Sequence, residues 1–236
     1  MKIFKSTTMS VCLAIVGLGS SATTLANNNF SGPYIGVETV YIHANDKGKE
    51  YDATGLDGYT QNLKPDGMGV GILGGYNWAL GSKAIAGVEV GYDHYREADT
   101  ISGQNYNGAL DCPVTSCQFK TDIKQSLSAV GRLGYLVTNN TLLYGLFGYS
   151  SAQIERSLNV VGDGNTSSET HKKWQDGWVA GAGVEYLASK NVSVKLEYRY
   201  TDLGNAKYRA AAWGGGYTEK FDYTQDQVLL GVNYRF

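Results

Sequence analysis

The last nine residues of the chain, 228–236, constrain its fold more than any other segment. Five of them are apolar or aromatic and fall on alternate positions: Val228, Leu230, Val232, Tyr234 and Phe236. Leu229 and three small or polar residues stand between them, so the pattern predicts a β-strand with one apolar face and one mostly small or polar face. An aromatic chain end would be unfavourable in water, whereas aromatic rings are favoured at the headgroup level of a bilayer. The ending therefore predicts a strand that crosses a membrane.

The first 26 residues have the build of a secretory signal peptide. Lys2 and Lys5 give a positive start, residues 11–19 are apolar, and mostly small residues follow as far as Ala26. The apolar segment is too short for a transmembrane helix, which needs about 20 residues. We expect cleavage after Ala26, with Ala22 as the alternative, and one mature barrel domain spanning residues 27–236.

Composition narrows the class of protein further. Removing the two lysines of the signal leaves 18 basic residues against 22 acidic ones, a formal net charge of −4 that argues against nucleic acid as a partner. The mature region has no apolar run of about 18 residues, so we expect no transmembrane helix. Gly is frequent, with 31 residues, and falls within the alternating segments. On the crowded inner face of a small barrel, Gly leaves room for a neighbour's long side chain.

Eight segments alternate in this way, and each is long enough for the roughly 9–11 residues of a tilted membrane-spanning strand. They are residues 33–43, 67–78, 84–95, 121–135, 141–153, 177–187, 192–201 and 223–236. Long polar segments (44–66, 96–120, 154–176 and 202–222) alternate with short turns, as in up-and-down barrels. We therefore predict an all-β fold, an eight-stranded antiparallel up-and-down transmembrane β-barrel with four long extracellular loops and three short periplasmic turns.

Charged positions within these strands must face the lumen, because Arg or Lys on the lipid face costs about 2–4 kcal/mol near the midplane. Residues 142–151 are apolar on both faces and receive no assignment. The interior of an eight-stranded barrel is just wide enough for side chains to fill, and buried charges need partners. We therefore expect a self-paired network that plugs the lumen, with a path for ions or small solutes as the alternative. Its four acids and four bases are Glu38, Glu89, Glu185, Glu197, Arg132, Lys195, Arg199 and Arg235.

Several motifs resemble the porin-family, OmpA-like outer-membrane β-barrel proteins, a group that includes opacity-type surface antigens. Residues 177–203 hold a Gly-x-Gly-x-Glu-Tyr strand, a short turn and a Leu-Glu-Tyr-Arg-Tyr strand. Residues 32–37 and 131–135 are similar to the first and fourth strands of that family. The segment 228–236 resembles the closing strand that the barrel assembly machinery reads. The resemblance implies the Gram-negative outer membrane as location, and roles as surface antigens, adhesins, structural proteins or narrow pores.

Catalytic and metal sites have little support in the sequence. His43, His94 and His171 are spread out, without the short spacing of metal ligands. Asp93 and His94 are adjacent on a strand and so face opposite sides. Ser168, Glu169 and His171 fall in a polar segment predicted to be a flexible loop, with nothing to preorganise them. We predict no enzyme, no metal and no cofactor.

The long loops carry the candidate recognition residues. The fourth loop holds Lys207, Tyr208, Arg209, Trp213 and Tyr217, which are types enriched at recognition surfaces. The same residues could instead rest on lipopolysaccharide. Our hypothesis is a monomeric barrel, in contact with outer-membrane lipid and lipopolysaccharide, in a structural or adhesive role. Its first, second and fourth long loops would meet host-cell or matrix ligands. The alternative is a narrow pore.

Two cysteines, Cys112 and Cys117, remain after removal of the signal and lie in the second long loop. An exported chain meets an oxidising compartment, so we expect them to form one disulfide. The ring they would close is short, so its entropic stabilisation is roughly 2 kcal/mol.

Overall fold

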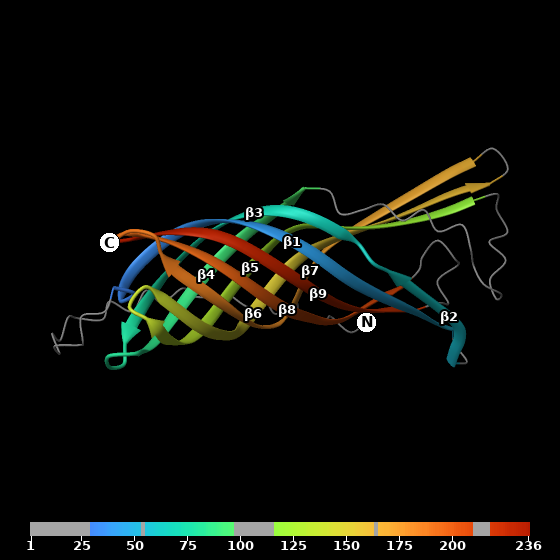
Figure 1. Cartoon of the computed structure of the whole chain (residues 1–236). Helices are drawn as coiled ribbons and strands as arrows, with labels where there is room; N and C mark the ends of the chain where they lie inside the picture. Colours follow the sequence, from blue (N-terminus) through green and yellow to red (C-terminus); the bar gives the residue numbers. More distant parts are fainter. Residues whose placement is uncertain (1–28, 53–54, 97–115, 163–164, 210–217) are drawn as a thin grey trace, which may run out of the picture.

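The strands follow one another around a closed ring in the computed structural model, which describes residues 29–52, 55–96, 116–162, 165–209 and 218–236 (Figure 1). All strand pairs are antiparallel. The described part of the chain contains nine strands: β1 (Gly32–Asp52), β2 (Gly55–Leu63), β3 (Asp66–Ala79), β4 (Ala84–Arg96), β5 (Ser116–Thr138), β6 (Thr141–Gly162), β7 (Asn165–Leu187), β8 (Val192–Arg209) and β9 (Thr218–Arg235).

The ring closes where β1 pairs with β9, from Tyr34 opposite Arg235 to Tyr51 opposite Thr218. β1 also pairs with β3, and each strand from β3 to β8 pairs with the next, so the eight-membered wall has no free edge at membrane level. Hydrocarbon offers no hydrogen-bonding partner, and closure satisfies the backbone within the wall. The predicted eight-stranded antiparallel barrel is confirmed. Among the described residues, no helix has the length and apolar character needed to cross a membrane.

Strands run further beyond the ring than the sequence predicts. β2 is an additional strand inside the predicted first loop, and it pairs with the outer part of β1. β6 and β7 stay paired as far as Gly162 opposite Asn165. The prediction that Ser168, Glu169 and His171 lie in a flexible loop is therefore wrong, because all three lie on β7. Outside the membrane both faces of a strand meet water, so apolar alternation is not required there.

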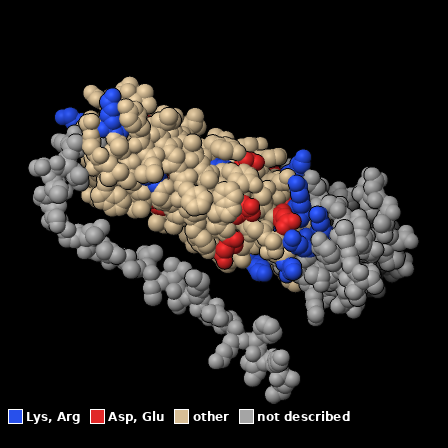
Figure 2. Space-filling model, turned by 90° about the horizontal axis from the view of Figure 1, so that it is seen from below, with Lys and Arg blue, Asp and Glu red and all other residues tan. Residues whose placement is uncertain are grey.

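An apolar belt surrounds the barrel on its outward face. Its most exposed members include Leu133 (69%), Phe147 (65%) and Ile72 (62%). Aromatic side chains lie toward both limits of the belt, as in transmembrane barrels, with Tyr76, Tyr135, Tyr186 and Tyr234 near the short turns and Tyr41, Tyr149, Trp178 and Tyr198 near the opposite end. Uncharged residues cover most of the middle of the face in Figure 2, and charged residues gather toward its ends.

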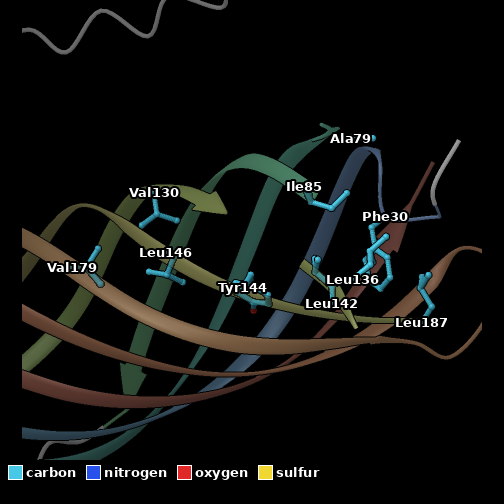
Figure 3. Close-up of a cluster of buried hydrophobic side chains, with 10 residues drawn as sticks. All are labelled: Phe30, Ala79, Ile85, Val130, Leu136, Leu142, Tyr144, Leu146, Val179 and Leu187. Atoms are coloured by element: carbon cyan, nitrogen blue, oxygen red, sulfur yellow. The ribbon is translucent and has the colours of Figure 1, made fainter. Parts of the chain in front are cut away.

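The structure assigns the faces of β6, which the sequence left open. Leu142, Tyr144 and Leu146 point inward, while Leu143 and Phe147 join the outward belt. The three inward residues belong to an apolar cluster that extends from the turn end of the barrel along β5, β6 and β7 (Figure 3). A second inward cluster, which includes Val40, Ile42 and Leu229, lies toward the opposite end. Charged inward residues lie beside both clusters, since Glu89 is opposite Val130 and Glu197 is opposite Leu229.

Glycine makes room for the large inward side chains, as at Gly183. A Cβ placed there would lie 2.6 Å from the Tyr144 hydroxyl oxygen and 3.0 Å from the Leu196 carbonyl oxygen. Gly145 on the neighbouring strand β6 points outward, and a Cβ there would meet no atom closer than 3.8 Å.

We expect Gly183→Ala to lower the free energy of unfolding by about 1–3 kcal/mol, because Tyr144 must leave its position. Gly145→Ala is the matched control, and its unfolding free energy should change by less than about 0.5 kcal/mol. Urea unfolding of the refolded barrel, followed by tryptophan fluorescence, measures both. An equal effect of the two substitutions would contradict the packing described here.

Candidate functional site

The middle of the barrel holds the eight charged side chains that the sequence places in the lumen. They project from β1, β4, β5, β7, β8 and β9, and none is more than 4% exposed. Alternation explains their position, because every second residue of a strand faces inward. β8 alone supplies Lys195, Glu197 and Arg199. Charges so far from water require partners, and the geometry supplies them.

Glu89 on β4 lies at the centre of the network. Its carboxylate is 2.9 Å from Arg199 Nη2, 3.1 Å from Arg132 Nη1 and 3.3 Å from Lys195 Nζ. It also accepts a hydrogen bond of 3.0 Å from the Tyr34 hydroxyl. Three cations from two strands thus share one carboxylate. Removal of Glu89 would leave all three with fewer partners.

Glu185 on β7 forms a second centre nearer the short turns. It pairs with Arg132 Nη2 at 3.0 Å and with Arg235 Nη2. Ser193 and Asn233 donate further hydrogen bonds to it. Arg132 therefore bridges Glu89 and Glu185, and its guanidinium also lies 3.9 Å from the centroid of the Tyr144 ring. This contact adds cation–π stabilisation in a desolvated place.

Lys195 extends the network toward β1. Its Nζ lies 2.8 Å from Glu38 and 3.9 Å from Glu197. Glu197 also pairs with Arg199 Nε and accepts a 2.7 Å hydrogen bond from the Tyr144 hydroxyl. All eight predicted charges are thereby connected through shared partners.

The structure adds an acid that the sequence analysis left out of this network. Asp93 on β4 faces inward, is 3% exposed and accepts a 3.2 Å hydrogen bond from Ser126. Within the described part of the chain, no donor reaches its Oδ1 atom. A Cβ at Gly71 would lie 2.1 Å from that oxygen and 3.1 Å from Glu38 Cγ, so both acids occupy the space over this glycine. Asp93 lies four residues after Glu89 on β4 and so falls on the same face of the strand. This alternation is the sequence feature that predicts its inward position.

Further polar residues line the interior toward the outer end. Asp46 is buried and pairs with Arg156, 3.1 Å away, and Thr121 donates to it. Both members of this pair lie in segments predicted to be loops, for which the sequence predicts no inward face. Tyr34 and Tyr144 are not among the predicted lumen residues either, because aromatic rings are favoured at the headgroup level and residues 142–151 have no predicted inward face. The predicted balance of four acids and four bases is therefore incomplete.

The remaining predicted residues lie apart from the network. His43 faces outward and contacts Asp66, His94 also faces outward, and His171 is exposed on β7. Among the described residues, no group of three or more His, Cys, Asp or Glu is placed to hold a metal ion. Lys207 is exposed on β8, and the alternate apolar residues from Val228 to Phe236 face outward. Cys112, Trp213 and Tyr217 lie outside the described residues, as do the side chains of Cys117, Tyr208 and Arg209.

Comparison with known proteins gives the family. The sequence pattern of the family described as outer membrane protein beta-barrel domain matches residues 11–236. The chain belongs to this family. It is an outer-membrane protein, as its signal-like start, apolar belt and closing strand predict, and the resemblance to OmpA-like barrels is confirmed.

Individual relatives agree with this family. The chain is 26% identical over 232 residues to the 31 kDa outer-membrane immunogenic protein of Brucella melitensis biotype 1, covering 94% of this chain and 91% of that protein. It is 30% identical over 172 residues to the 22 kDa outer membrane protein of Rhizobium leguminosarum bv. viciae, covering 72% and 67%. The crystal structure of the outer membrane protein OprG from Pseudomonas aeruginosa matches with a TM-score of 0.53 at 12% identity, covering 89% and 99%. The last likeness shows the shared fold alone.

We expect Glu185→Gln to lower the free energy of unfolding by about 3–5 kcal/mol, because Arg132 and Arg235 then stay buried with too little negative charge. The matched control is Glu155→Gln on β6, whose partner Lys172 is exposed, and its loss should stay below about 1 kcal/mol. Urea titration of the folded fraction, read from heat-shifted gel mobility, measures both. Similar small losses in the two variants would show that the network does not hold the barrel together.

Proposed function

We propose that this outer-membrane barrel is a scaffold with a plugged lumen that displays its outer strands and loops in a structural and adhesive role. The ion-pair network around Glu89 carries the first half of this proposal. Inward apolar residues lie beside it, with Val130 opposite Glu89 and Leu229 opposite Glu197, and its cations and carboxylates hold one another at 2.8–3.3 Å. A solute in transit would have to separate these pairs in a place where bulk water does not replace them.

The outer extension of the wall supports the display role. Among the described residues, pairing of β7 with β8 ends at Trp178 opposite Asp202. Beyond that point the wall divides into a β5–β6–β7 sheet and a β8–β9–β1–β2 sheet (Figure 1). β7 continues from there to Asn165, a length of roughly 40 Å at 3.3 Å per residue. So long an extension serves no purpose in spanning the membrane, and a relative is named for its immunogenicity.

A narrow pore is the second candidate, and Asp93 favours it. This acid has no basic partner within ion-pair distance among the described residues, so the middle of the lumen carries more acid than base. An excess of acid would favour cations over anions in any opening. We infer in addition that the chain is not an enzyme, since its histidines lie apart on β1, β4 and β7.

The proposal includes the processing and assembly expected from the sequence. Cleavage after Ala26 would release a monomeric domain of residues 27–236. The outward apolar residues of β9 would be read by the barrel assembly machinery during insertion. The disulfide between Cys112 and Cys117 remains part of the proposal.

Single-channel recording in a planar bilayer tests the plug. The refolded wild-type barrel should be silent or flicker rarely, whereas Glu89→Ser combined with Arg132→Ser should conduct in proportion to salt, because it removes two central members of the network. Heat-shifted gel mobility confirms folding of each sample. A steady wild-type conductance would overturn the plug and make the cation pore the primary function.

Removal of the β6–β7 extension tests adhesion. A variant in which a short turn replaces residues 156–172 keeps the membrane-spanning strands and should lose most binding to host cells or extracellular matrix. Cells that display equal amounts of the two proteins are compared by adhesion counting, with a strain that lacks the protein as the baseline. Unchanged binding, repeated when the β1–β2 extension is shortened, would remove the adhesive half of the proposal.

A further inference from the structure

Three lysines lie side by side on neighbouring strands of the outer extension. Lys220 on β9 is directly opposite Lys49 on β1 and directly opposite Lys207 on β8. Lys47 lies two residues before Lys49 on the same face, opposite Asp222. We call Lys47, Lys49, Lys207 and Lys220 the lysine row. Neighbouring strands are about 4.8 Å apart, so the three opposed lysines fall within a width of about 10 Å.

The lysine row faces out from the barrel wall. Lys47, Lys49 and Lys207 are exposed, whereas the alternate residues Gly48, Ala206 and Phe221 are buried on the inner side. The row therefore shares its face with the outward belt residues Tyr41 and Tyr198. Lys220 Nζ is 3.8 Å from Asp222, a loose contact that offsets only part of the charge. In Figure 2, basic residues gather together with acidic ones at the end of the uncharged belt that borders the grey residues.

Such a row is unfavourable unless something compensates it, because like charges directly opposite on neighbouring strands destabilise a sheet. The other outer sheet shows the usual solution. There Glu155 on β6 is opposite Lys172 on β7, and the two form an ion pair of 3.0 Å. Among the residues whose side chains the structure describes, Asp222 alone brings a carboxylate next to the lysine row, so these lysines have less neighbouring negative charge than Lys172 has.

The distance of the lysine row from the hydrocarbon indicates which molecules lie beside it. Lys49 lies eight residues beyond Tyr41, and Lys220 lies eight residues before Val228, which is opposite Tyr41 at the limit of the belt. With a rise of about 3.3 Å per residue and a tilt near 40°, the row is about 20 Å above the hydrocarbon. That height is above the headgroup phosphates next to the hydrocarbon and within the sugar layer of the outer leaflet. Because the row faces sideways, its neighbours are glycolipids of the same membrane.

We propose that the lysine row binds the phosphorylated sugar core of lipopolysaccharide. The inference rests on the proposed function only in placing this end of the barrel outside the cell. Phosphate groups on adjacent sugars would meet two or three ammonium groups at once. The contact would hold the β8–β9–β1–β2 sheet against the glycolipid layer and order it there.

Calorimetry tests the site on the refolded mature chain in phosphatidylcholine nanodiscs. The probe is core oligosaccharide released from lipopolysaccharide, in a phosphorylated and an enzymatically dephosphorylated form. The wild type should bind the phosphorylated form only, and Lys49→Gln with Lys207→Gln and Lys220→Gln should weaken binding on the order of 100-fold. The matched control replaces Lys83, Lys172 and Lys190 by Gln, which removes as much charge elsewhere, and should bind as the wild type does.

Each other outcome overturns the proposal. Equal binding by both triple variants would show that only net charge matters. Equal binding of the two oligosaccharides would show that phosphate is not recognised. A soluble sulfated polysaccharide is titrated in parallel, and binding of that polymer alone through the lysine row would place the partner outside the membrane.

Hydrogen exchange separates binding from a structural role. Without ligand, the lysine-row variant should exchange β8 and β9 amides no faster than the wild type, because it relieves repulsion. Phosphorylated core should slow exchange of these amides in the wild type alone. Faster exchange in the unliganded variant would assign the lysines a structural role instead. The plug and adhesion tests change the ion-pair network and the β6–β7 extension, whereas this test changes the lysine row. A negative result for one proposal is therefore distinguishable from a negative result for the other.

Discussion

The barrel wall separates two environments, neither of which offers its residues bulk water, and the rest of the structure depends on this constraint. Lipid surrounds the outward belt, and packed side chains occupy the inside. Backbone groups are therefore satisfied around the ring, which the β1–β9 pairing closes. Inward charges are satisfied by one another, which is why a single carboxylate such as Glu89 holds three cations. The closed ring supplies partners to the backbone, and the ion-pair network supplies partners to the inward charges, in both cases because bulk water is absent.

The membrane-spanning part of the fold could be predicted because charged side chains are excluded from the face that contacts lipid. Along β8, Lys195, Glu197 and Arg199 could not face hydrocarbon, so their parity fixed both faces of the strand. Beyond the apolar belt this exclusion no longer applies, since either face of a strand there can be polar. β2 and the outer halves of β6 and β7 therefore gave no periodic signal. Their pairing follows from neighbours continuing in register, which is a property of the sheet and not of one segment.

Part of the lumen could not be predicted, because the inside of this barrel holds apolar and aromatic side chains as well as charged ones. β6 places Leu142 and Tyr144 inward, next to apolar residues of β5 and β7. Such residues also suit the lipid face, so only the surrounding strands decide between the two. Tyr144 donates to Glu197 and stacks on Arg132, and the space it needs comes from Gly183 on β7. That combination involves four strands, and no single segment reveals it.

The long β6–β7 hairpin has a consequence for how such a protein can diverge. Its strands remain in register from Thr141 opposite Tyr186 out to Gly162 opposite Asn165. Insertions that add the same number of residues to both strands near the bend would lengthen the projection and leave the spanning register untouched. An unmatched single insertion would instead force a bulge or turn the residues beyond it to the other face. The reach of this arm can therefore change in paired steps without any change in the register of the membrane-spanning strands.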